Sequence, residues 1–247
     1  MNIVWLDTID STNSEVLRRL AELPSLTVLA AREQTAGRGQ RGNTWFTEPG
    51  KNLTFSIVVK FAEGQLHASQ VHWLNYLMSD VVSMFLRSYG IDCTIKWPND
   101  VYVQRRKICG ILIENTLKGE WVDAAVIGTG ININQREFPQ LANATSLVRC
   151  YGQEQDLEAC MEKVAALFEE ELPWLFSERS RAGLFDRYSG RLFLKDTTAR
   201  FHDLLEEREY RGCIRGVEAD GRLCIRDLDA PGRPYRYYRF KEVGYIL

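Results

Sequence analysis

Residues 32–45 read Arg32-Glu33-Gln34-Thr35-Ala36-Gly37-Arg38-Gly39-Gln40-Arg41-Gly42-Asn43-Thr44-Trp45. Three glycines alternate with two arginines in this stretch, a pattern that suits neither a regular helix nor a regular strand. Glycine allows backbone N–H groups to come close to a ligand, and the planar guanidinium of arginine matches phosphate or carboxylate. The stretch therefore predicts a loop that folds over an anionic ligand, with an exposed turn that binds nothing as the alternative interpretation.

The segments on either side of this loop are apolar and predict strands. Thr27–Ala31 runs directly into the loop, and Leu53–Val59 leaves it, with Lys51 and Lys60 as its flanking charges. A glycine-rich loop held between two core strands suits a mobile lid on a rigid base.

The composition is that of an ordinary globular protein with a local excess of positive charge. The 247 residues are 45% hydrophobic and 26% charged, enough for one large domain with or without a small appendage. The net charge of −2 gives no bulk indication of nucleic-acid binding. Residues 32–60 nevertheless carry five basic and two acidic side chains, and residues 96–107 carry four and one. A basic site in a nearly neutral chain fits a small anionic ligand such as a nucleotide.

Cysteine usage and hydropathy bear on the location of the protein. The six cysteines form no Cys-x-x-Cys pair and only three histidines occur, which argues against a structural zinc site. The first residues carry no signal-peptide pattern, and no apolar run approaches the ~20 residues of a membrane span. We therefore expect a cytoplasmic protein with reduced thiols and no membrane association.

The N-terminal segment predicts a strand followed by a helix. Ile3–Leu6 is apolar, and Asp10-Ser11-Thr12-Asn13 precedes a helical pattern of apolar residues that Pro24 ends. Ser11 or Thr12 is suited to cap this helix. Capping alone is the commoner role, but such a cap also offers hydroxyl and N–H groups to a ligand.

A second group of polar and basic residues stands in the middle of the chain. A long buried helix is predicted up to Tyr89-Gly90, and Lys96-Trp97-Pro98-Asn99-Asp100 follows it. Val101–Val103 and Ile108–Asn115 then predict a hairpin.

Lys107 stands at the start of the second hairpin strand. Simple alternation places it on one face with Cys109 and Ile111, pointing toward the protein body. A lysine that extends past the strand end into solvent is the alternative. Gly110, close by, allows a ligand to lie against the strand.

The next strand contains a glycine pair. Trp121–Ile133 is apolar but is interrupted by Gly128-Thr129-Gly130, with Asn132 behind it. Gly-x-Gly inside a strand predicts a bulge or a tight backbone contact with a ligand. An amphipathic helix over Asp156–Leu172 and a further helical stretch up to Tyr188 follow.

The character of the chain changes after Gly190. Short strands alternate with turns, and Asp220-Gly221 is a strong hairpin signal. We therefore expect a large domain over residues 1–189 and a small all-β domain over residues 190–247.

Four motifs now stand in one order along the chain, and together they closely resemble those of the biotin protein ligases (biotin–[acetyl-CoA-carboxylase] ligases). The match covers residues ~10–134, about half the chain. The four motifs are Asp10-Ser11-Thr12-Asn13, Gln34-Thr35-Ala36-Gly37-Arg38-Gly39-Gln40, Lys96-Trp97-Pro98-Asn99-Asp100 with Lys107 and Gly110, and Gly128-Thr129-Gly130-Ile131-Asn132.

The resemblance implies an α+β fold: a class II synthetase-like catalytic domain, with a mixed sheet packed against helices, followed by a small SH3-like all-β domain. It implies that biotin reacts with Mg-ATP to give biotinyl-5′-AMP and pyrophosphate. A lysine on a biotin carboxyl carrier protein domain then accepts the biotinyl group.

The resemblance also implies roles for individual residues. Arg38 and Lys107 are the expected catalytic residues, and the metal ligands stay unknown, with Asp100 as a partner of Lys107 or of Mg²⁺. The expected biotin-binding residues are Ser11, Thr12, Asn13, Gln34, Gly37, Arg38, Gly39, Gln40, Lys107 and Gly110. The expected nucleotide-binding residues are Arg38, Arg41, Trp45, Asn99, Lys107 and Asn132.

Elementary chemistry agrees with these roles. Carboxylate and phosphate repel each other, so their reaction needs positive charge between them, which Arg38 and Lys107 can supply. An acyl-adenylate hydrolyses readily, so a closing loop is needed to exclude water. Hydroxyl and amide groups suit the neutral ureido ring of biotin.

Two features depart from parts of the family. Some members carry an N-terminal helix-turn-helix domain, for which a motif starting at Ser11 leaves no room, so we expect no specific DNA binding. Some members also have arginine or lysine where this chain has Gln40 and Asn43. The sequence leaves the oligomeric state open, a homodimer included.

Two alternatives remain. A lipoate–protein ligase is similar in fold and chemistry, but its arginine-rich, multi-glycine motif is absent. A non-catalytic biotin-binding module is the other, although binding of biotin alone would need neither Arg38 nor Lys107.

Overall fold

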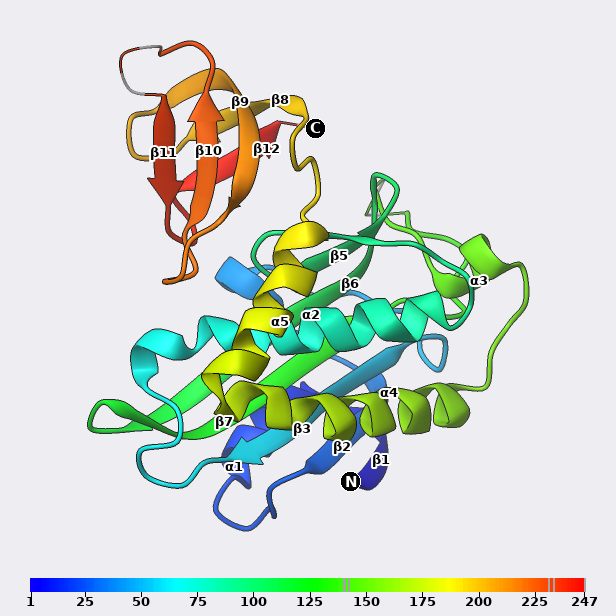
Figure 1. Ribbon diagram of the computed structural model, residues 1–247. Helices are drawn as coiled ribbons and strands as arrows, with labels where there is room; N and C mark the ends of the chain where they lie inside the picture. Colours follow the sequence, from blue (N-terminus) through cyan, green and yellow to red (C-terminus); the bar gives the residue numbers. More distant parts are fainter. Residues whose placement is uncertain (140, 142, 231, 233, 247) are drawn as a thin grey trace.

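The computed structural model describes residues 1–139, 141, 143–230, 232 and 234–246, and for Arg41 the backbone alone. Two sheets organise the described chain (Figure 1). A seven-stranded sheet with helices on both faces forms the larger, N-terminal unit. A five-stranded antiparallel sheet forms the smaller, C-terminal unit.

The larger sheet is mixed. Its first strand is parallel to the second and every other neighbouring pair is antiparallel. The spatial order is β1-β2-β3-β7-β6-β5-β4. The bounds are β1 Asn2–Ile9, β2 Thr27–Gln34, β3 Leu53–Lys60, β4 Thr94–Lys96, β5 Asp100–Val103, β6 Arg106–Lys118 and β7 Trp121–Ile131.

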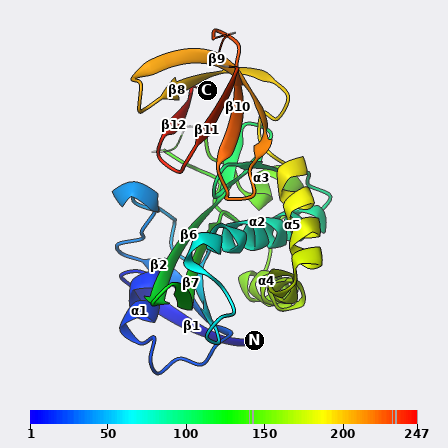
Figure 2. The same ribbon diagram turned by 60° about the vertical axis from the view of Figure 1, so that its left-hand side comes forward.

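The two faces of this sheet are covered unequally. Figure 2 shows α1 (Thr12–Arg18) on one side of the strands and the longer helices α2 (His72–Arg87), α4 (Leu157–Glu171) and α5 (Glu178–Gly190) on the other. The helix α1 is only seven residues long and packs Val16 against Leu29, Val58 and Val126. Because the cover is so short, the same sheet face is left without a helix beyond the N-terminus of α1.

The sheet face opposite α1 packs against α2, α4 and α5 in a continuous apolar core. This core contains a buried ionic cluster. Asp80 of α2 is fully buried and accepts hydrogen bonds from Arg187, at 2.5 Å, and from Arg191, while Arg187 also pairs with Glu171. This cluster joins α2, α4 and α5, and α5 is the helix that leads into the C-terminal unit.

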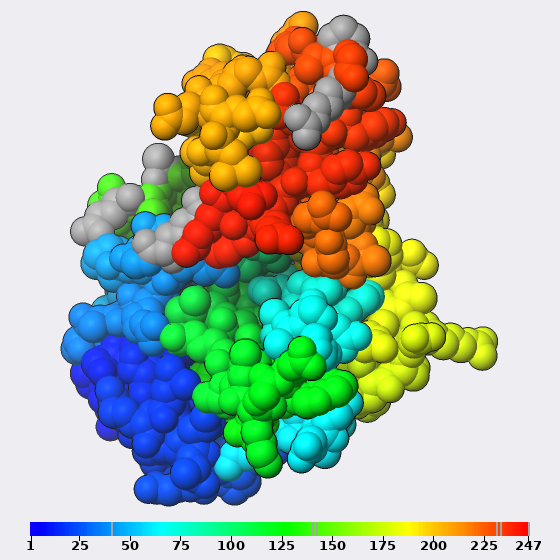
Figure 3. Space-filling model, turned by 90° about the vertical axis from the view of Figure 1, so that its left-hand side faces the viewer, coloured from blue at the N-terminus to red at the C-terminus, as the bar shows by residue number. Residues whose placement is uncertain are grey.

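The C-terminal unit follows α5 and rests on the larger one. Figure 3 shows its red and orange segments in direct contact with the cyan and green segments of the large unit. Trp97 Nε1 donates to the carbonyl oxygen of Gly221 at 3.1 Å, and Ile95 exchanges backbone hydrogen bonds with Arg191 and Phe193. The strand order is β11-β10-β9-β8-β12, with β8 Thr198–Asp203, β9 Arg208–Val217, β10 Leu223–Asp227, β11 Tyr235–Tyr238 and β12 Val243–Ile246.

The predicted fold class is confirmed: a mixed sheet packed with helices precedes a small antiparallel sheet. The boundary at residue 190 stays a prediction. The expected helix up to Pro24 is shorter than predicted, since α1 ends at Arg18 and turns carry Leu23 into the core. Sequence patterns did not reveal β12 or the short helix α3 (Leu147–Tyr151).

Within the described residues, no helix is both long and apolar enough to cross a membrane.

Candidate active site

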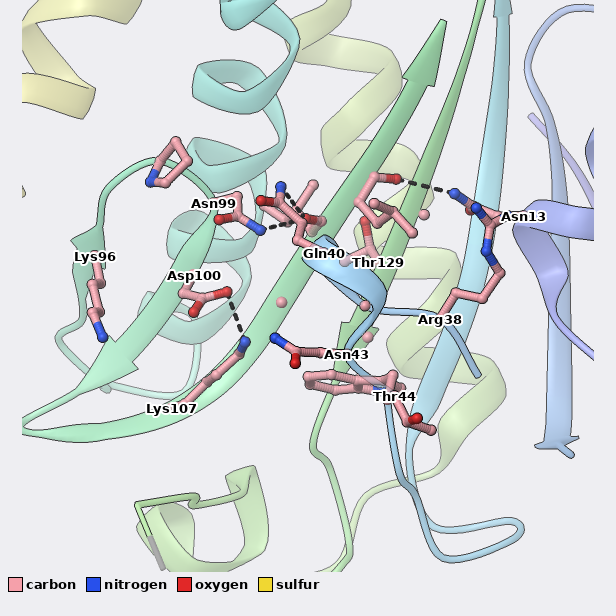
Figure 4. Close-up of a pocket in the computed structure, with 18 of the residues that line it drawn as sticks. Asn13, Arg38, Gln40, Asn43, Thr44, Lys96, Asn99, Asp100, Lys107 and Thr129 are labelled. Atoms are coloured by element: carbon pink, nitrogen blue, oxygen red, sulfur yellow. Dashed lines mark hydrogen bonds and ion pairs between the residues drawn. The ribbon is translucent and has the colours of Figure 1, made fainter. Parts of the chain in front are cut away.

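A cavity of about 340 Å³ lies on the sheet face that α1 leaves uncovered, at the N-terminus of that helix. Figure 4 shows side chains from α1, the 35–45 loop, β4, β5, β6 and β7 around it. Of the residues predicted to bind substrates, the lining includes Ser11, Thr12, Asn13, Gln34, Arg38, Gly39, Gln40, Trp45, Asn99, Lys107 and Gly110. The fold therefore brings together residues that lie almost a hundred positions apart.

Gly110, Gly128 and Gly130 belong to the cavity lining, and side chains of the same chain lie close over them. A Cβ on Gly128 would lie 2.1 Å from Asn13 Oδ1, and a Cβ on Gly130 would lie 2.3 Å from the Trp45 ring. A Cβ on Gly110 would come within 3.0 Å of the same ring. The pairing of β7 with β3 and β6 runs unbroken through Gly128 and Gly130, so the first predicted alternative, a bulge, is absent there. The second alternative, a tight backbone contact with a ligand, stays a prediction.

Hydrogen-bonding groups gather at the α1 end of the cavity. The backbone N–H and hydroxyl of Thr12 donate to Gln34 Oε1 at 2.8 and 3.1 Å. The Ser56 hydroxyl lies 2.8 Å from Thr12 Oγ1 and 2.5 Å from Asn13 Oδ1. Ser11 is the N-cap residue of α1, but within the described chain its side chain makes no capping bond. Its hydroxyl is thus free to face the cavity.

Ser56 was not predicted from sequence. It is fully buried within the apolar β3, and Thr54 two residues before it is also buried. The sequence did contain a signal for this residue. Two hydroxyl side chains two positions apart lie on one face of the strand, whereas a strand that packs only against apolar core has no use for buried hydroxyl groups.

Arg38 does not point at Lys107. Its guanidinium pairs with Glu114 on β6, at 2.8 Å to Oε1 and 3.1 Å to Oε2. Asn13 Nδ2 donates to the same carboxylate at 2.9 Å. Glu114 therefore connects the glycine–arginine loop to the polar end of the cavity, a contact that no local pattern around Glu114 indicated.

Lys107 faces the cavity for a reason that differs from the prediction. Its Nζ lies 2.7 Å from Asp100 Oδ1 and 5.5 Å from the centre of the Trp45 ring. In the β5–β6 pairing, Tyr102 faces Lys107 and Val101 faces Cys109, so Ile108 is an extra residue. A bulge of this kind shifts the alternation of side chains by one position. The predicted shared face of Lys107 and Cys109 is therefore wrong: Cys109 is buried in the core, and Lys107 lies beside Gly110.

Two predicted residues, Gly37 and Asn132, are not part of the cavity lining. Gly37 instead lets the loop close, since its carbonyl accepts from Trp45 N–H at 2.9 Å and a Cβ there would lie 2.3 Å from the Trp45 oxygen. Asn132 is buried behind the cavity and donates to the Thr145 carbonyl at 2.9 Å, so the geometry gives its predicted nucleotide contact no support. The side chain of Arg41 lies outside the described residues.

The C-terminal unit also contributes to the lining, which sequence reasoning missed. Lys96 of β4 and four residues of the small unit, Phe240, Val243, Gly244 and Tyr245, complete one side of the cavity. No local pattern signals such a contribution, because it depends on how the two units dock.

The described residues bear on metal binding and on disulfide bonding. They contain no group of three or more His, Cys, Asp or Glu side chains placed to hold a metal ion. All six cysteines are free thiols.

The profile of the biotin/lipoate A/B protein ligase family matches residues 5–132, more than half of the chain. The chain belongs to this family. The matched segment contains α1, the glycine–arginine loop, the strands β2 to β7 and most of β1.

Several members of the family are similar to this chain in sequence or in structure. The bifunctional ligase/repressor BirA of Escherichia coli is 32% identical over 91% of this chain and 69% of its own length. The biotin–[acetyl-CoA-carboxylase] ligase of Paracoccus denitrificans is 35% identical over 50% of this chain, which spans about half of that enzyme. The biotin protein ligase of Aquifex aeolicus, solved in complex with biotin and ATP, superposes with a TM-score of 0.79 at 26% identity, covering 98% of this chain and 97% of that one.

Proposed function

We propose that this chain is a biotin–carrier protein ligase: it activates biotin with ATP as biotinyl-5′-AMP and transfers the biotinyl group to a lysine of a biotin carboxyl carrier domain. One observation carries the proposal. A single cavity has an uncharged hydrogen-bonding end, at Thr12 and Gln34, and a positively charged side chain, Lys107, farther along. Relatives named as biotin ligases, and a solved relative that holds biotin and ATP, support it.

The polar end of the cavity suits the ureido ring of biotin. That ring presents two N–H donors and one carbonyl acceptor, and it is uncharged. Ser11 before α1, Thr12 on α1 and Gln34 on β2 place hydroxyl and amide groups there without a net charge. Ser56 on β3 lies behind them and donates to the Thr12 hydroxyl. Gly128 and Gly130 make room for the Asn13 side chain and the Trp45 ring, which lie over them and border the space left for the fused ring.

The cationic centre suits the first chemical step. A carboxylate oxygen of biotin attacks the α-phosphorus of ATP, the bond from that phosphorus to the bridging oxygen breaks, and pyrophosphate leaves with the bonding electrons. Charge builds up around the α-phosphate in the transition state. Lys107, beside Gly110 and with its Nζ over the Trp45 ring, supplies a fixed positive charge at that place.

The second step is an acyl transfer. The amine of the carrier lysine attacks the carbonyl carbon of biotinyl-5′-AMP, an amide forms, and AMP leaves. Since the mixed anhydride hydrolyses in water, the loop that carries Arg38 and Trp45 has to shield it until the carrier arrives.

Magnesium would arrive with the nucleotide. The ion prefers oxygen ligands and usually keeps waters and substrate phosphates in its shell. Asp100 is a lining carboxylate that fits this donor set, through the oxygen that Lys107 does not occupy.

The test is biotin-dependent exchange of labelled pyrophosphate into ATP, with lipoate as the control substrate. Mass spectrometry of an apo carrier domain should then show one added biotin on one lysine. Exchange that lipoate supports and biotin does not, or no mass increase on the carrier, would overturn the proposal.

Specific DNA binding is not part of the proposed function, although the Escherichia coli relative is named a repressor. The net charge of −2 favours its absence. A gel shift at physiological salt that distinguishes one DNA sequence from another would contradict this prediction.

A further inference from the structure

Two lysines line one side of the cavity, and their surroundings differ. Lys107 is paired with Asp100. Lys96 forms no ion pair among the described residues; its Nζ instead lies over two aromatic rings, 5.4 Å from the centre of Tyr102 and 4.9 Å from the centre of Tyr245. Tyr102 belongs to the large unit and Tyr245 to β12 of the C-terminal unit, so Lys96 sits at the junction of the two.

We propose that Lys96 binds the pyrophosphate portion of ATP and the departing pyrophosphate, and that Tyr245 is the residue of the C-terminal unit that positions it. This inference rests on the proposed ligase function and assigns a role to a residue outside the predicted site.

The direction of the reaction places the leaving group near Lys96. In a phosphoryl-transfer step the attacking and leaving oxygens lie roughly in line with the reacting phosphorus. Biotin reaches Lys107 from the end of the cavity that holds Asn13 and Arg38. In Figure 4, Asp100 and Lys107 lie between Arg38 and Lys96, so the side opposite the attack is the side of Lys96.

The electrostatics of Lys96 suit a polyanion that comes and goes. Burial lowers the pKa of the Lys96 ammonium; Asp100 opposes this effect and Lys107 adds to it. Such a cation is poorly compensated without a ligand, and it gains more from a bound phosphate than a solvated surface lysine would. Aromatic faces hold it in place without neutralising its charge.

Tyr245 is suited to position the lysine through its ring. The ring packs near Phe201 at 5.5 Å and Phe193 at 6.5 Å, and its buried hydroxyl has no hydrogen-bond partner among the described residues. The hydroxyl therefore contributes little to this arrangement, and the ring contributes most of it. Through this contact the small unit acts on the first chemical step.

The experiment compares binding of pyrophosphate with binding of biotin. Calorimetric titration of the full chain with pyrophosphate needs no turnover, so it is informative even if the ligase activity is not found. Pyrophosphate exchange then gives the KM for pyrophosphate and for ATP. The variants are Lys96→Gln, Tyr245→Leu and Tyr245→Phe, each checked for a cooperative thermal transition.

Two matched controls come from the same chain. Lys118→Gln removes a lysine that is 77% exposed and paired only loosely with Glu63, at 3.9 Å. Tyr237→Leu removes a ring beneath Arg222, at 5.4 Å, on the same C-terminal unit but outside the cavity lining.

Lys96→Gln should weaken pyrophosphate binding and raise the KM for ATP about tenfold or more, the loss of one charge-assisted contact, with the biotin Kd unchanged. Tyr245→Leu should shift the same constants in the same direction by a smaller factor, and Tyr245→Phe should leave them unchanged.

The proposal is overturned if Lys96→Gln binds pyrophosphate as tightly as Lys118→Gln does, or if the biotin affinity of Lys96→Gln falls by the same factor as its pyrophosphate affinity. It is also overturned for Tyr245 if Tyr237→Leu has an equal effect. If the unsubstituted chain binds pyrophosphate through Lys96 but shows no exchange, the proposed function fails and this assignment stands.

Discussion

Lys107 Nζ lies 2.7 Å from Asp100 Oδ1 across the bulged end of the β5–β6 hairpin. The pair fixes the position of the ammonium group at the cavity. We expect Lys107 to act chiefly in the transition state, where charge develops at the α-phosphate. Lys107→Ala should lower the single-turnover rate of adenylation by about 10²–10³-fold, as loss of one preorganised donor does. Biotin affinity should fall less, because the ureido contacts remain.

Lys107→Arg is the informative companion, since a planar fork does not replace a compact charge beside Gly110 and should not restore the rate. An unchanged adenylation rate in Lys107→Ala, or equal losses in rate and biotin affinity, would show that the assignment is wrong.

Arg38 should hold the adenylate in place through the closed loop. Its pairing with Glu114 joins the loop to β6 at the polar end of the cavity. Arg38→Gly should release biotinyl-5′-AMP into solvent, where it labels lysines of bystander proteins. Glu114→Gln keeps Arg38 but removes the charge of its partner, and it should leak less than Arg38→Gly. Blotting for biotin on added albumin measures the release; retention equal to that of the parent would refute this role.

Gly130 should be intolerant of a side chain. An alanine Cβ there would lie 2.3 Å from the Trp45 ring, so the ring and its loop have to move. Because misplacing a group by about 1 Å can cost roughly 10²-fold in rate, Gly130→Ala should lower adenylation on that scale. Gly190→Ala is the control, since an added Cβ at Gly190 meets no atom within 4 Å. Comparable adenylation rates in the two variants would count against the tight contact.

Asp80 should contribute strongly to stability. Its carboxylate is fully buried and holds both Arg187 and Arg191. Asp80→Asn leaves their charges partly uncompensated and should lower the free energy of unfolding by about 3–5 kcal/mol. Glu63→Gln removes an 80% exposed carboxylate and should cost about 0–1 kcal/mol. Urea unfolding of both variants measures these free energies. Similar losses in the free energy of unfolding for Asp80→Asn and Glu63→Gln would contradict the prediction.

Asp10 should make stability depend on acid pH. Hydrogen bonds from Arg18, and then from the Ser11 N–H, lower the pKa of Asp10 from 3.8 to about 2. A lowered carboxyl pKa contributes stability that is present above pH 3.8 and is lost as the pH falls through about 2. Asp10→Asn should therefore have a lower Tm than the parent at pH 6, and the difference should shrink as the pH falls toward 2. Since the pair is half exposed, the difference should be small, and a difference independent of pH would disprove the linkage.

The sequence by itself determined most of the elements and the motifs on which the proposed chemistry rests. Apolar periodicity located β2, β3, α2 and α4, because each pattern reflects burial of the segment's own residues. The glycines and arginines of residues 32–45 indicated an anion-binding loop for an equally local reason. Glycine gives the backbone conformational freedom, and arginine supplies positive charge.

The tertiary structure alone decided which groups meet. The bulge at Ile108 turned Lys107 to the cavity, and a strand bulge depends on the partner strand. Glu114 reached Arg38, and Ser56 reached Thr12, across 76 and 44 positions of the chain. Tyr245 reached Lys96 only because the small unit docks on the large one. Such contacts are set by packing between distant segments, so no local pattern in the chain specifies them.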